Sequence, residues 1–259
     1  MQNQNEQIDI VLIHGWGMNQ GIWSQFAGLL SQRVNSKVHC IDLPGYGTQF
    51  DSVPPSYDLQ SVVDTVHAQL PKRSIVLGWS LGGVITQALV AKADSKVVAH
   101  IQLCSSPKFI EDAAWPGIKP AVLNMFAKQL TQNHESVLTR FLAIQCMGLD
   151  SPNQTVKTML GMLKAHPLSS PSVLNSSLEL LSSVDLREQV KRFDTIPCLR
   201  IFGRLDSLVP AKVVAQIQAL NPSCEVHIMP KASHASFISH ESDTLALLAD
   251  FIHRVNYTS

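Results

Sequence analysis

The sequence predicts an α/β fold, in which a mostly parallel sheet is flanked by helices and carries an inserted helical lid. Short apolar runs alternate with helix-like patterns along residues 8–104 and again along residues 198–255. This order specifies parallel strands joined by right-handed crossovers. Residues 105–194 contain helical patterns only. We therefore predict a core built from residues 1–104 and 195–259, with residues 105–194 forming a four-helix lid.

The predicted strands are mostly continuous apolar runs, which is the pattern of strands buried on both faces of a sheet. They fall at residues 8–13, 38–41, 75–77, 97–104, 198–202 and 225–229. The helices between them show apolar residues at helical spacing, and Asp58 precedes one of them as a candidate N-cap. These helices fall at about residues 22–30, 59–70, 84–92, 211–220 and 243–255.

The lid helices are predicted mainly from the residues that begin them. Ser151-Pro152 and Ser170-Pro171 each place a capping serine before a proline at the first helical position. Pro120 opens another helix, and a fourth spans about residues 135–147. Because no strand pattern interrupts these helices, we expect them to form a subdomain of their own.

The charge balance excludes several classes of partner. The 20 basic and 20 acidic side chains cancel, so the chain has no overall attraction for nucleic acid or an anionic membrane. Residues 1–7 show no secretory signal, and the apolar runs are too short to span a bilayer. The five cysteines are scattered without CxxC spacing, so we expect buried, reduced thiols. We predict a cytoplasmic monomer that needs no cofactor and no metal.

The segment Gly78-Trp79-Ser80-Leu81-Gly82 joins a predicted strand to a predicted helix. A serine in this setting lies on a sharp, strained turn that projects its hydroxyl beyond the sheet. Glycines two residues before and two after it leave room where side chains would collide. Free N–H groups at the start of the following helix stabilise a developing oxyanion. Ser80 is therefore the candidate nucleophile.

A serine nucleophile needs a base and a third group that orients the base. Asp206 and His234 each follow a predicted strand, so both reach the sheet edge that carries Ser80. The order Ser, Asp, His is that of the α/β hydrolases. Asp206 taken alone also suits a turn or a helix cap. His14 follows a strand too, but it precedes Ser80, and we assign it a structural role.

Two backbone N–H groups are candidates for an oxyanion hole. One belongs to Leu81, directly after the nucleophile, and the other to Trp16 in the loop His14-Gly15-Trp16-Gly17. Each such donor typically contributes about 3 to 4 kcal/mol in the transition state. The side chain of Trp16 either walls the pocket or is a core indole. No His-x-x-x-His pair or His/Cys cluster has the spacing of a metal site.

Several stretches of the chain, two of them in the lid, carry a more specific pattern. They are His14-Gly15-Trp16-Gly17, Gly78-Trp79-Ser80-Leu81-Gly82-Gly83, Trp115-Pro116-Gly117-Ile118-Lys119-Pro120, Arg140-Phe141-Leu142-Ala143-Ile144-Gln145 and Ala232-Ser233-His234-Ala235-Ser236-Phe237-Ile238-Ser239-His240. The chain thereby resembles the BioH-type pimeloyl-[acyl-carrier protein] methyl ester esterases of biotin synthesis. The resemblance implies the α/β-hydrolase fold, with the lid inserted after the sixth strand. The N-terminal strand common in this fold is expected to be shortened or absent.

The resemblance implies a serine carboxylesterase that releases methanol from a pimeloyl methyl ester carried on acyl carrier protein. It implies substrate contacts at Trp16, Ser80, Leu81, Phe141, Leu142, Ala143, Ile144, Gln145 and His234. We expect Phe141 to line the acyl pocket while Leu138 and Leu142 face the lid's own core. A general short-chain carboxylesterase or lipase is an alternative, as is a hydrolase-fold protein that binds a ligand without turnover.

The lid has a local excess of basic side chains in a neutral protein. Arg140 matches the family pattern, whereas Asn153 and Lys157 stand where arginines are expected. Residues 113–178 carry five basic side chains against two acidic ones: Lys119, Lys128, Arg140, Lys157 and Lys164 against Glu135 and Asp150. We predict that Arg140 and Lys157 dock the acidic carrier protein. An ordinary solvated face is the alternative interpretation.

Overall fold

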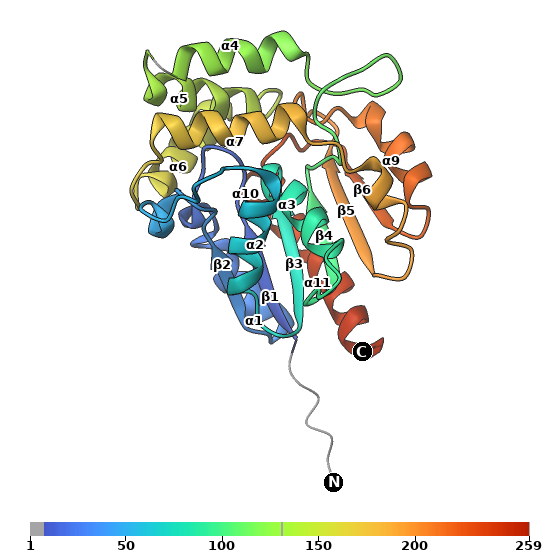
Figure 1. Cartoon of the computed structure of the whole chain (residues 1–259). Coiled ribbons are helices and arrows are strands. Elements are labelled where there is room, and N and C mark those ends of the chain that lie inside the picture. Colours follow the sequence, from blue (N-terminus) through green and yellow to red (C-terminus); the bar gives the residue numbers. More distant parts are fainter. Residues whose placement is uncertain (1–7, 131, 259) are drawn as a thin grey trace.

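The computed structural model describes residues 8–130 and 132–258 of the chain (Figure 1). The prediction that residues 1–7 carry no signal segment lies outside these ranges. A six-stranded parallel sheet has the strand order β2-β1-β3-β4-β5-β6. Its strands are β1 (Asp9–Ile13), β2 (Val38–Ile41), β3 (Ser74–Trp79), β4 (Val97–Leu103), β5 (Cys198–Gly203) and β6 (Glu225–Met229). The predicted strands are confirmed, with ends that differ by no more than two residues.

Helices cover both faces of the sheet. Helix α1 packs against α11 on one face, while α3 packs against β3, β4, α2 and α8 on the other (Figure 1). These helices, with α9, are α1 (Phe26–Val34), α2 (Leu59–Gln69), α3 (Leu81–Val90), α8 (Arg187–Val190), α9 (Val214–Leu220) and α11 (Glu241–Thr258). Asp58 caps α2 as predicted, because its side chain accepts the N–H of Ser61 at 2.8 Å.

Two predicted core helices are divided in the structure. The one expected at about residues 211–220 begins as a 3-10 turn, η3 (Ala211–Val213), ahead of α9. The helix expected at about residues 22–30 is a short 3-10 turn, η1 (Gln20–Trp23), followed by the separate helix α1. The side chain of Asn19 accepts the N–H of Gly21 at 3.0 Å and so caps the short turn. Helix α1 continues to Val34 and ends where Asn35 adopts a left-handed φ of 49°. The prediction missed this division because apolar spacing alone does not register a capping side chain.

In the described residues between β4 and β5, four helices lie across the carboxyl edge of the sheet, and the short helix α8 follows them (Figure 1). These lid helices are α4 (Pro120–Leu130), α5 (His134–Gln145), α6 (Pro152–Leu163) and α7 (Pro171–Ser183). The chain enters the lid after β4 and returns to the sheet at β5. The expected insertion after a sixth strand is therefore wrong for this chain. Among the described residues, four strands precede the lid helices.

The two ends of the lid segment are tied together beside the core. Lys108 forms an isolated antiparallel bridge with Asp185, and its ammonium group lies 3.6 Å from the carboxylate of Asp185. The guanidinium of Arg187 lies 5.2 Å from the centre of the Trp115 ring, in the geometry of a cation–π contact. These contacts fix where the lid leaves and rejoins the core.

The prediction that all five cysteines are reduced thiols holds for three of them and fails for two. Cys198 and Cys224 form a disulfide, so the prediction is wrong for this pair, whereas Cys40, Cys104 and Cys146 are free. Cys198 begins β5 and Cys224 directly precedes β6, and the pairing of these strands brings the two Cα atoms to 4.8 Å. A separation of 26 residues gives no local signal of this contact, because the sheet creates it.

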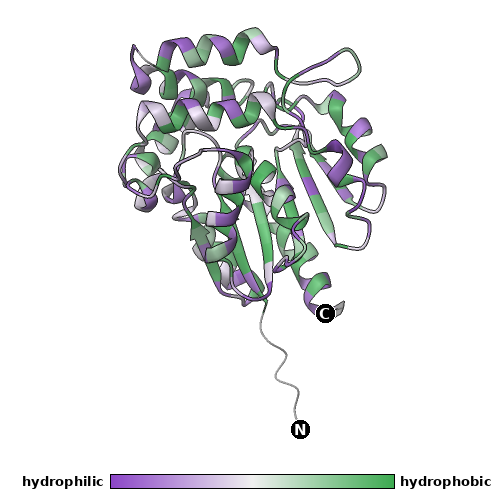
Figure 2. Ribbon diagram, viewed as in Figure 1, coloured by the Kyte–Doolittle hydropathy of each residue, from purple (hydrophilic) through white to green (hydrophobic). Residues whose placement is uncertain are grey.

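Hydropathy differs between the sheet and the lid. The strands are mostly hydrophobic, whereas the lid helices mix hydrophobic and hydrophilic residues (Figure 2). Among the described residues, no helix combines the length and the apolar character that crossing a membrane requires. The apolar sheet is therefore the rigid base on which the polar groups at its carboxyl edge are placed.

Candidate active site

Ser80 lies on a sharp turn between β3 and α3. Its backbone has a φ of 56° and a ψ of −119°, a conformation that residues other than glycine rarely adopt. The glycines on either side are required by close backbone contacts. A Cβ on Gly78 would lie 2.2 Å from the carbonyl oxygen of Gly82, and one on Gly82 would lie 2.4 Å from that of Ile13. The strained turn holds Ser80 at the carboxyl edge of the sheet.

Asp206 and His234 form a buried, hydrogen-bonded pair at the same edge. His234 Nδ1 lies 2.7 Å from Asp206 Oδ2, and neither side chain is exposed. Asp206 Oδ1 accepts the N–H groups of Leu208 at 2.8 Å and Val209 at 3.0 Å. Because a carboxylate accepts hydrogen bonds, the ring proton of His234 lies on Nδ1 and Nε2 is left as the proton acceptor.

The loop that carries His234 is held from two sides. The backbone N–H of His234 donates to the carbonyl oxygen of Gln145 in the lid at 3.2 Å. The backbone carbonyl of His234 accepts Trp79 Nε1 at 2.9 Å, next to the nucleophile. His234 Nε2 is buried and has no hydrogen-bond partner within residues 8–130 and 132–258. This ring nitrogen is therefore available to accept the hydroxyl proton of Ser80.

The loop after β1 lies directly against the nucleophile. A Cβ on Gly15 would lie 3.0 Å from Ser80 Cβ, so the backbone just before Trp16 lies close to the nucleophile. Leu81 is the first residue of α3, and a helix has no internal acceptor for its first N–H groups. The indole of Trp16 is fully buried, and its Nε1 donates to the carbonyl oxygen of Leu174 in the lid at 2.9 Å. Trp16 therefore joins the core loop to the lid.

His14 has the structural role that we assign to it, and Asp42 shares this role. His14 Nε2 accepts the N–H of Leu43 at 3.0 Å and lies 3.6 Å from Asp42 Oδ1. Asp42 accepts the N–H groups of Gln20 at 2.6 Å and Thr48 at 2.7 Å. Burial lowers the pKa of His14 more than the Asp42 carboxylate raises it, so the ring is neutral. The sequence prediction missed Asp42, although it directly follows a strand as the triad residues do.

The lid contacts the core loop through apolar side chains of α5. The ring of Phe141 meets Trp16 edge-on at 4.7 Å and Phe126 at 5.7 Å, measured between ring centres. Leu138 also reaches the core, because its Cδ2 would lie 2.6 Å from a Cβ on Gly17. Leu138 is expected to face the lid's own core, and the structure adds this contact with the core loop.

The predicted substrate-binding segment 141–145 has two faces. Phe141, Leu142 and Gln145 are buried, Ile144 is half-buried, and Ala143 is exposed. An α-helix turns about 100° per residue, so consecutive residues cannot all face one pocket. Gln145 Oε1 is buried without a hydrogen-bond partner among the described residues. The buried face of α5 therefore offers both apolar surface and one free polar atom.

The predicted docking residues are on the surface of the lid. Arg140 is exposed on α5 and donates to Gln129 Oε1 at 2.9 Å, and Lys157 is exposed on α6. A groove of 760 Å³ separates α6 from the segment 230–241, and the triad residues do not line it. Ser80 itself is 3 % exposed, so the lid in this position nearly closes the nucleophile off from solvent.

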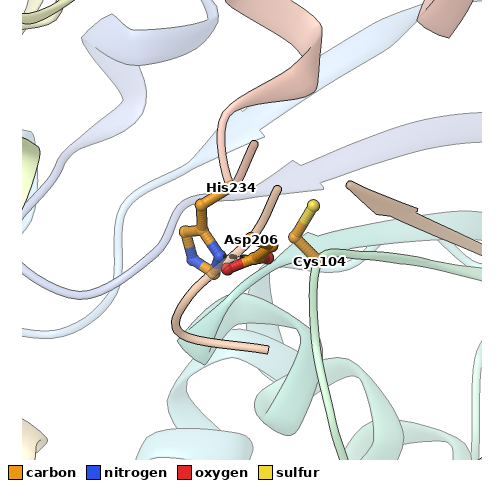
Figure 3. Close-up of side chains that lie close together, drawn as sticks. All are labelled: Cys104, Asp206 and His234. Carbon is orange, nitrogen blue, oxygen red and sulfur yellow. Dashed lines mark hydrogen bonds and ion pairs between the residues drawn. The ribbon is translucent and has the colours of Figure 1, made fainter. Parts of the chain in front are cut away.

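The sequence prediction also missed Cys104, which directly follows β4. Its Sγ lies within 4.8 Å of a carboxylate oxygen of Asp206 and of a ring nitrogen of His234 (Figure 3). The three residues come from the ends of β4, β5 and β6, far apart in the sequence. No spacing pattern could reveal this cluster, because the order of strands in the sheet creates it.

Solved structures of other proteins share the fold. An esterase from Exiguobacterium antarcticum superposes with a TM-score of 0.81 at 18% identity, covering 95% of this chain and 92% of that one. A bromoperoxidase from Bacillus anthracis has a TM-score of 0.83 at 18% identity, with the same coverage. At this level of identity the likeness establishes the fold alone.

Sequence comparisons are more specific. The model of the alpha/beta hydrolase family matches residues 10–248. The pimeloyl-[acyl-carrier protein] methyl ester esterase of Edwardsiella ictaluri is 40% identical over 243 residues, which cover 94% of this chain and 92% of that one. The protein of the same name from Aliivibrio salmonicida is 38% identical, covering 97% and 94%. The chain therefore belongs to the α/β hydrolases and, among them, to the family of pimeloyl-[acyl-carrier protein] methyl ester esterases.

Proposed function

We propose that this protein is a serine carboxylesterase that hydrolyses the methyl ester of a pimeloyl group carried on acyl carrier protein. The observation that carries the chemistry is the buried Asp206–His234 pair beside the strained turn of Ser80. Family membership supports the choice of substrate, because relatives that bear this name align with more than nine tenths of the chain. The place of the reaction in biotin synthesis is part of the same proposal.

In the proposed reaction, Ser80 Oγ attacks the ester carbonyl while His234 Nε2 takes the hydroxyl proton. The N–H groups of Leu81 and Trp16 donate to the developing oxyanion. His234 then gives its proton to the departing methanol, and an acyl-enzyme remains. A water molecule, deprotonated by His234, attacks the acyl-enzyme and releases the free acid. Asp206 holds the imidazole and stabilises its charged form throughout.

The acyl chain is proposed to lie between the core loop and α5. Trp16 and Phe141 are in edge-on contact at this boundary, and they offer an apolar wall from both sides. Gln145 adds a buried, unpaired amide oxygen close to the His234 loop. A buried acceptor without a partner is costly, which favours its use by a polar group of the substrate.

The carrier protein is proposed to dock on the exposed face of the lid. Arg140 and Lys157 are both exposed, and both belong to the basic excess of residues 113–178. Acyl carrier proteins are acidic, so such a face accelerates encounter by electrostatic steering. The cytoplasmic location and the monomeric state stay predictions, and gel filtration beside light scattering checks the second.

The rate on pimeloyl methyl ester attached to acyl carrier protein, compared with the rate on a short free methyl ester, tests the substrate. We expect a much higher kcat/KM for the carrier-bound ester, with Ser80→Ala as the inactive control. Equal values for both esters would make the protein a general esterase. Binding of the carrier-bound ester without any methanol release would make it a hydrolase-fold binding protein instead.

A further inference from the structure

Cys104, Asp206 and His234 form a fully buried cluster of metal-binding residue types (Figure 3). Cys104 is held by two contacts. Its backbone N–H donates to the carbonyl oxygen of Ile201 at 2.8 Å, and its Sγ lies 3.8 Å from the carbonyl oxygen of Ser233. One sulfur, one carboxylate oxygen and one ring nitrogen all lie within 4.8 Å of one another. This is a ligand set of the kind that binds Zn²⁺.

From these contacts we propose that the cluster binds a soft divalent cation of the Zn²⁺ or Cd²⁺ class, and that the bound ion switches off the esterase. Three protein ligands with an open fourth position are typical of reactive zinc sites. Bonds of about 2.0 to 2.3 Å to tetrahedral ligands place the ligand atoms about 3.3 to 3.7 Å apart. The Nδ1–Oδ2 pair, now at 2.7 Å, has to open, and the sulfur, which lies up to 4.8 Å from the other ligand atoms, has to move closer.

The charge of the buried cluster favours a divalent cation. The cluster contains the carboxylate of Asp206, which is hydrogen-bonded to the ring of His234, and the thiol of Cys104 lies beside this pair. A divalent cation bound to a carboxylate, a thiolate and a neutral imidazole gives a net charge of zero. Burying this neutral complex costs less than burying an unbalanced ion.

The loss of activity follows from where the protons go. The thiol S–H breaks, its proton leaves to solvent, and a metal–sulfur bond forms. The metal also takes the lone pair at His234 Nδ1, so the ring proton moves from Nδ1 to Nε2. Nε2 then carries a hydrogen and cannot accept the proton of Ser80. This effect on activity rests on the proposed role of His234, whereas the binding of the cation does not.

Inhibition of short-ester hydrolysis by Zn²⁺ and Cd²⁺ tests the consequence, with each variant compared with its own metal-free rate. We expect reversible inhibition of the wild type, relieved by a chelator. Cys104→Ala should raise the half-inhibiting concentration at least tenfold. Cys40→Ala is the control, because Cys40 is also a free thiol but is half-buried on β2 and is not part of the cluster. Equal sensitivity of the wild type and Cys104→Ala would overturn the proposal.

Binding can be measured without turnover. Cd²⁺ should produce ultraviolet thiolate-to-metal absorption in the wild type that is absent in Cys104→Ala and weakened in Asp206→Asn. Calorimetry in buffers of different ionisation enthalpy should report about one proton released per ion in the wild type and none in Cys104→Ala. Absorption that is identical in the wild type and Cys104→Ala would place the ion elsewhere and end the proposal. Neither the absorption nor the calorimetry uses the carrier-bound ester. Both measurements therefore test cation binding even if the proposed substrate is wrong.

Discussion

The core and the lid contribute to the site in different ways. The core supplies Ser80, Asp206 and His234 at the ends of its strands, where the backbone beside Ser80 is packed so closely that a Cβ on Gly78 or Gly82 would clash. The lid supplies the buried face of α5 and an exposed basic surface. Changes in the core should therefore alter the rate of the chemical steps, while changes in the lid should alter which substrate is accepted.

The largest expected effect lies in the core. Ser80→Ala, His234→Ala and Asp206→Asn should each lower kcat by about 10⁴-fold or more, because each removes a member of the proton-transfer unit. Single-turnover kinetics on a free ester measure the loss, and circular dichroism checks the fold. A folded Ser80→Ala protein with ordinary esterase activity would rule out the proposed mechanism.

Glycine substitutions compare the packing of the two regions directly. Gly82→Ala should destabilise the protein by about 3 kcal/mol or more, because the new Cβ would meet the backbone oxygen of Ile13 at 2.4 Å and that of His14 at 2.6 Å. Gly161→Ala in lid helix α6 is the matched control, since no atom lies within 4 Å of its Cβ position. That change should stabilise by up to about 1 kcal/mol. Denaturant unfolding measures the free energy of unfolding of both variants. A similar loss of stability in the two variants would contradict the expected difference between core and lid.

Acid should weaken the core more than the lid. Burial, together with the charge of Arg200, lowers the pKa of His100 to about 3. The lid histidines His134 and His166 are only half-buried. The unfolded chain protonates a histidine near pH 6.5. The stability from His100 is therefore complete above pH 6.5 and is lost as pH falls from 6.5 toward 3.

The unfolding free energy should fall by about 2 kcal/mol between pH 7 and pH 5 on account of His100 alone. His100→Gln should reduce this pH dependence, whatever its effect on stability at pH 7. His166→Gln, a change in the lid, should leave the dependence as it is. If the two variants show the same pH dependence as the wild type, His100 does not cause the acid sensitivity.

In the lid, Phe141→Ala should raise KM for the pimeloyl ester about tenfold, with a smaller rise for an acetate ester. The reason is that Phe141 contacts Trp16 at the proposed acyl wall. Phe126→Ala is the control, because Phe126 is equally buried in the lid and packs behind Phe141. Both variants lose similar apolar burial, so a change in the KM ratio that is confined to Phe141→Ala reports substrate contact. An equal effect on both esters would favour a purely structural role.

The smallest effect is expected on the lid surface. Arg140→Glu should lower kcat/KM for the carrier-bound ester several-fold, with Lys157→Glu adding to the loss and with the free ester unaffected. The wild-type rate on the carrier-bound ester should also fall as salt rises. Lys72→Glu is the control, because this exposed lysine precedes β3 at the opposite edge of the sheet. A salt response shared by both esters would remove the case for docking at this face.

Much of the core could be predicted from the sequence because its signals are local. A strand buried on both faces is a short apolar run, and the turn of Ser80 is specified by glycines at fixed spacing. The order of Ser80, Asp206 and His234 then follows from parallel strands, whose carboxyl ends meet at one edge. The lid helices were found in the same way, from a serine before a proline at Ser151 and Ser170.

Only the tertiary structure decided which residues meet across that edge. Asp42 reaches His14, Cys104 reaches Asp206, and Cys198 pairs with Cys224, because the sheet places their strands next to or near one another. Leu138 contacts Gly17 for a similar reason, since the lid is folded over the core loop. Residue spacing along one strand or helix determines its own geometry. The distance between side chains on different strands depends on strand order and register, which no local pattern encodes.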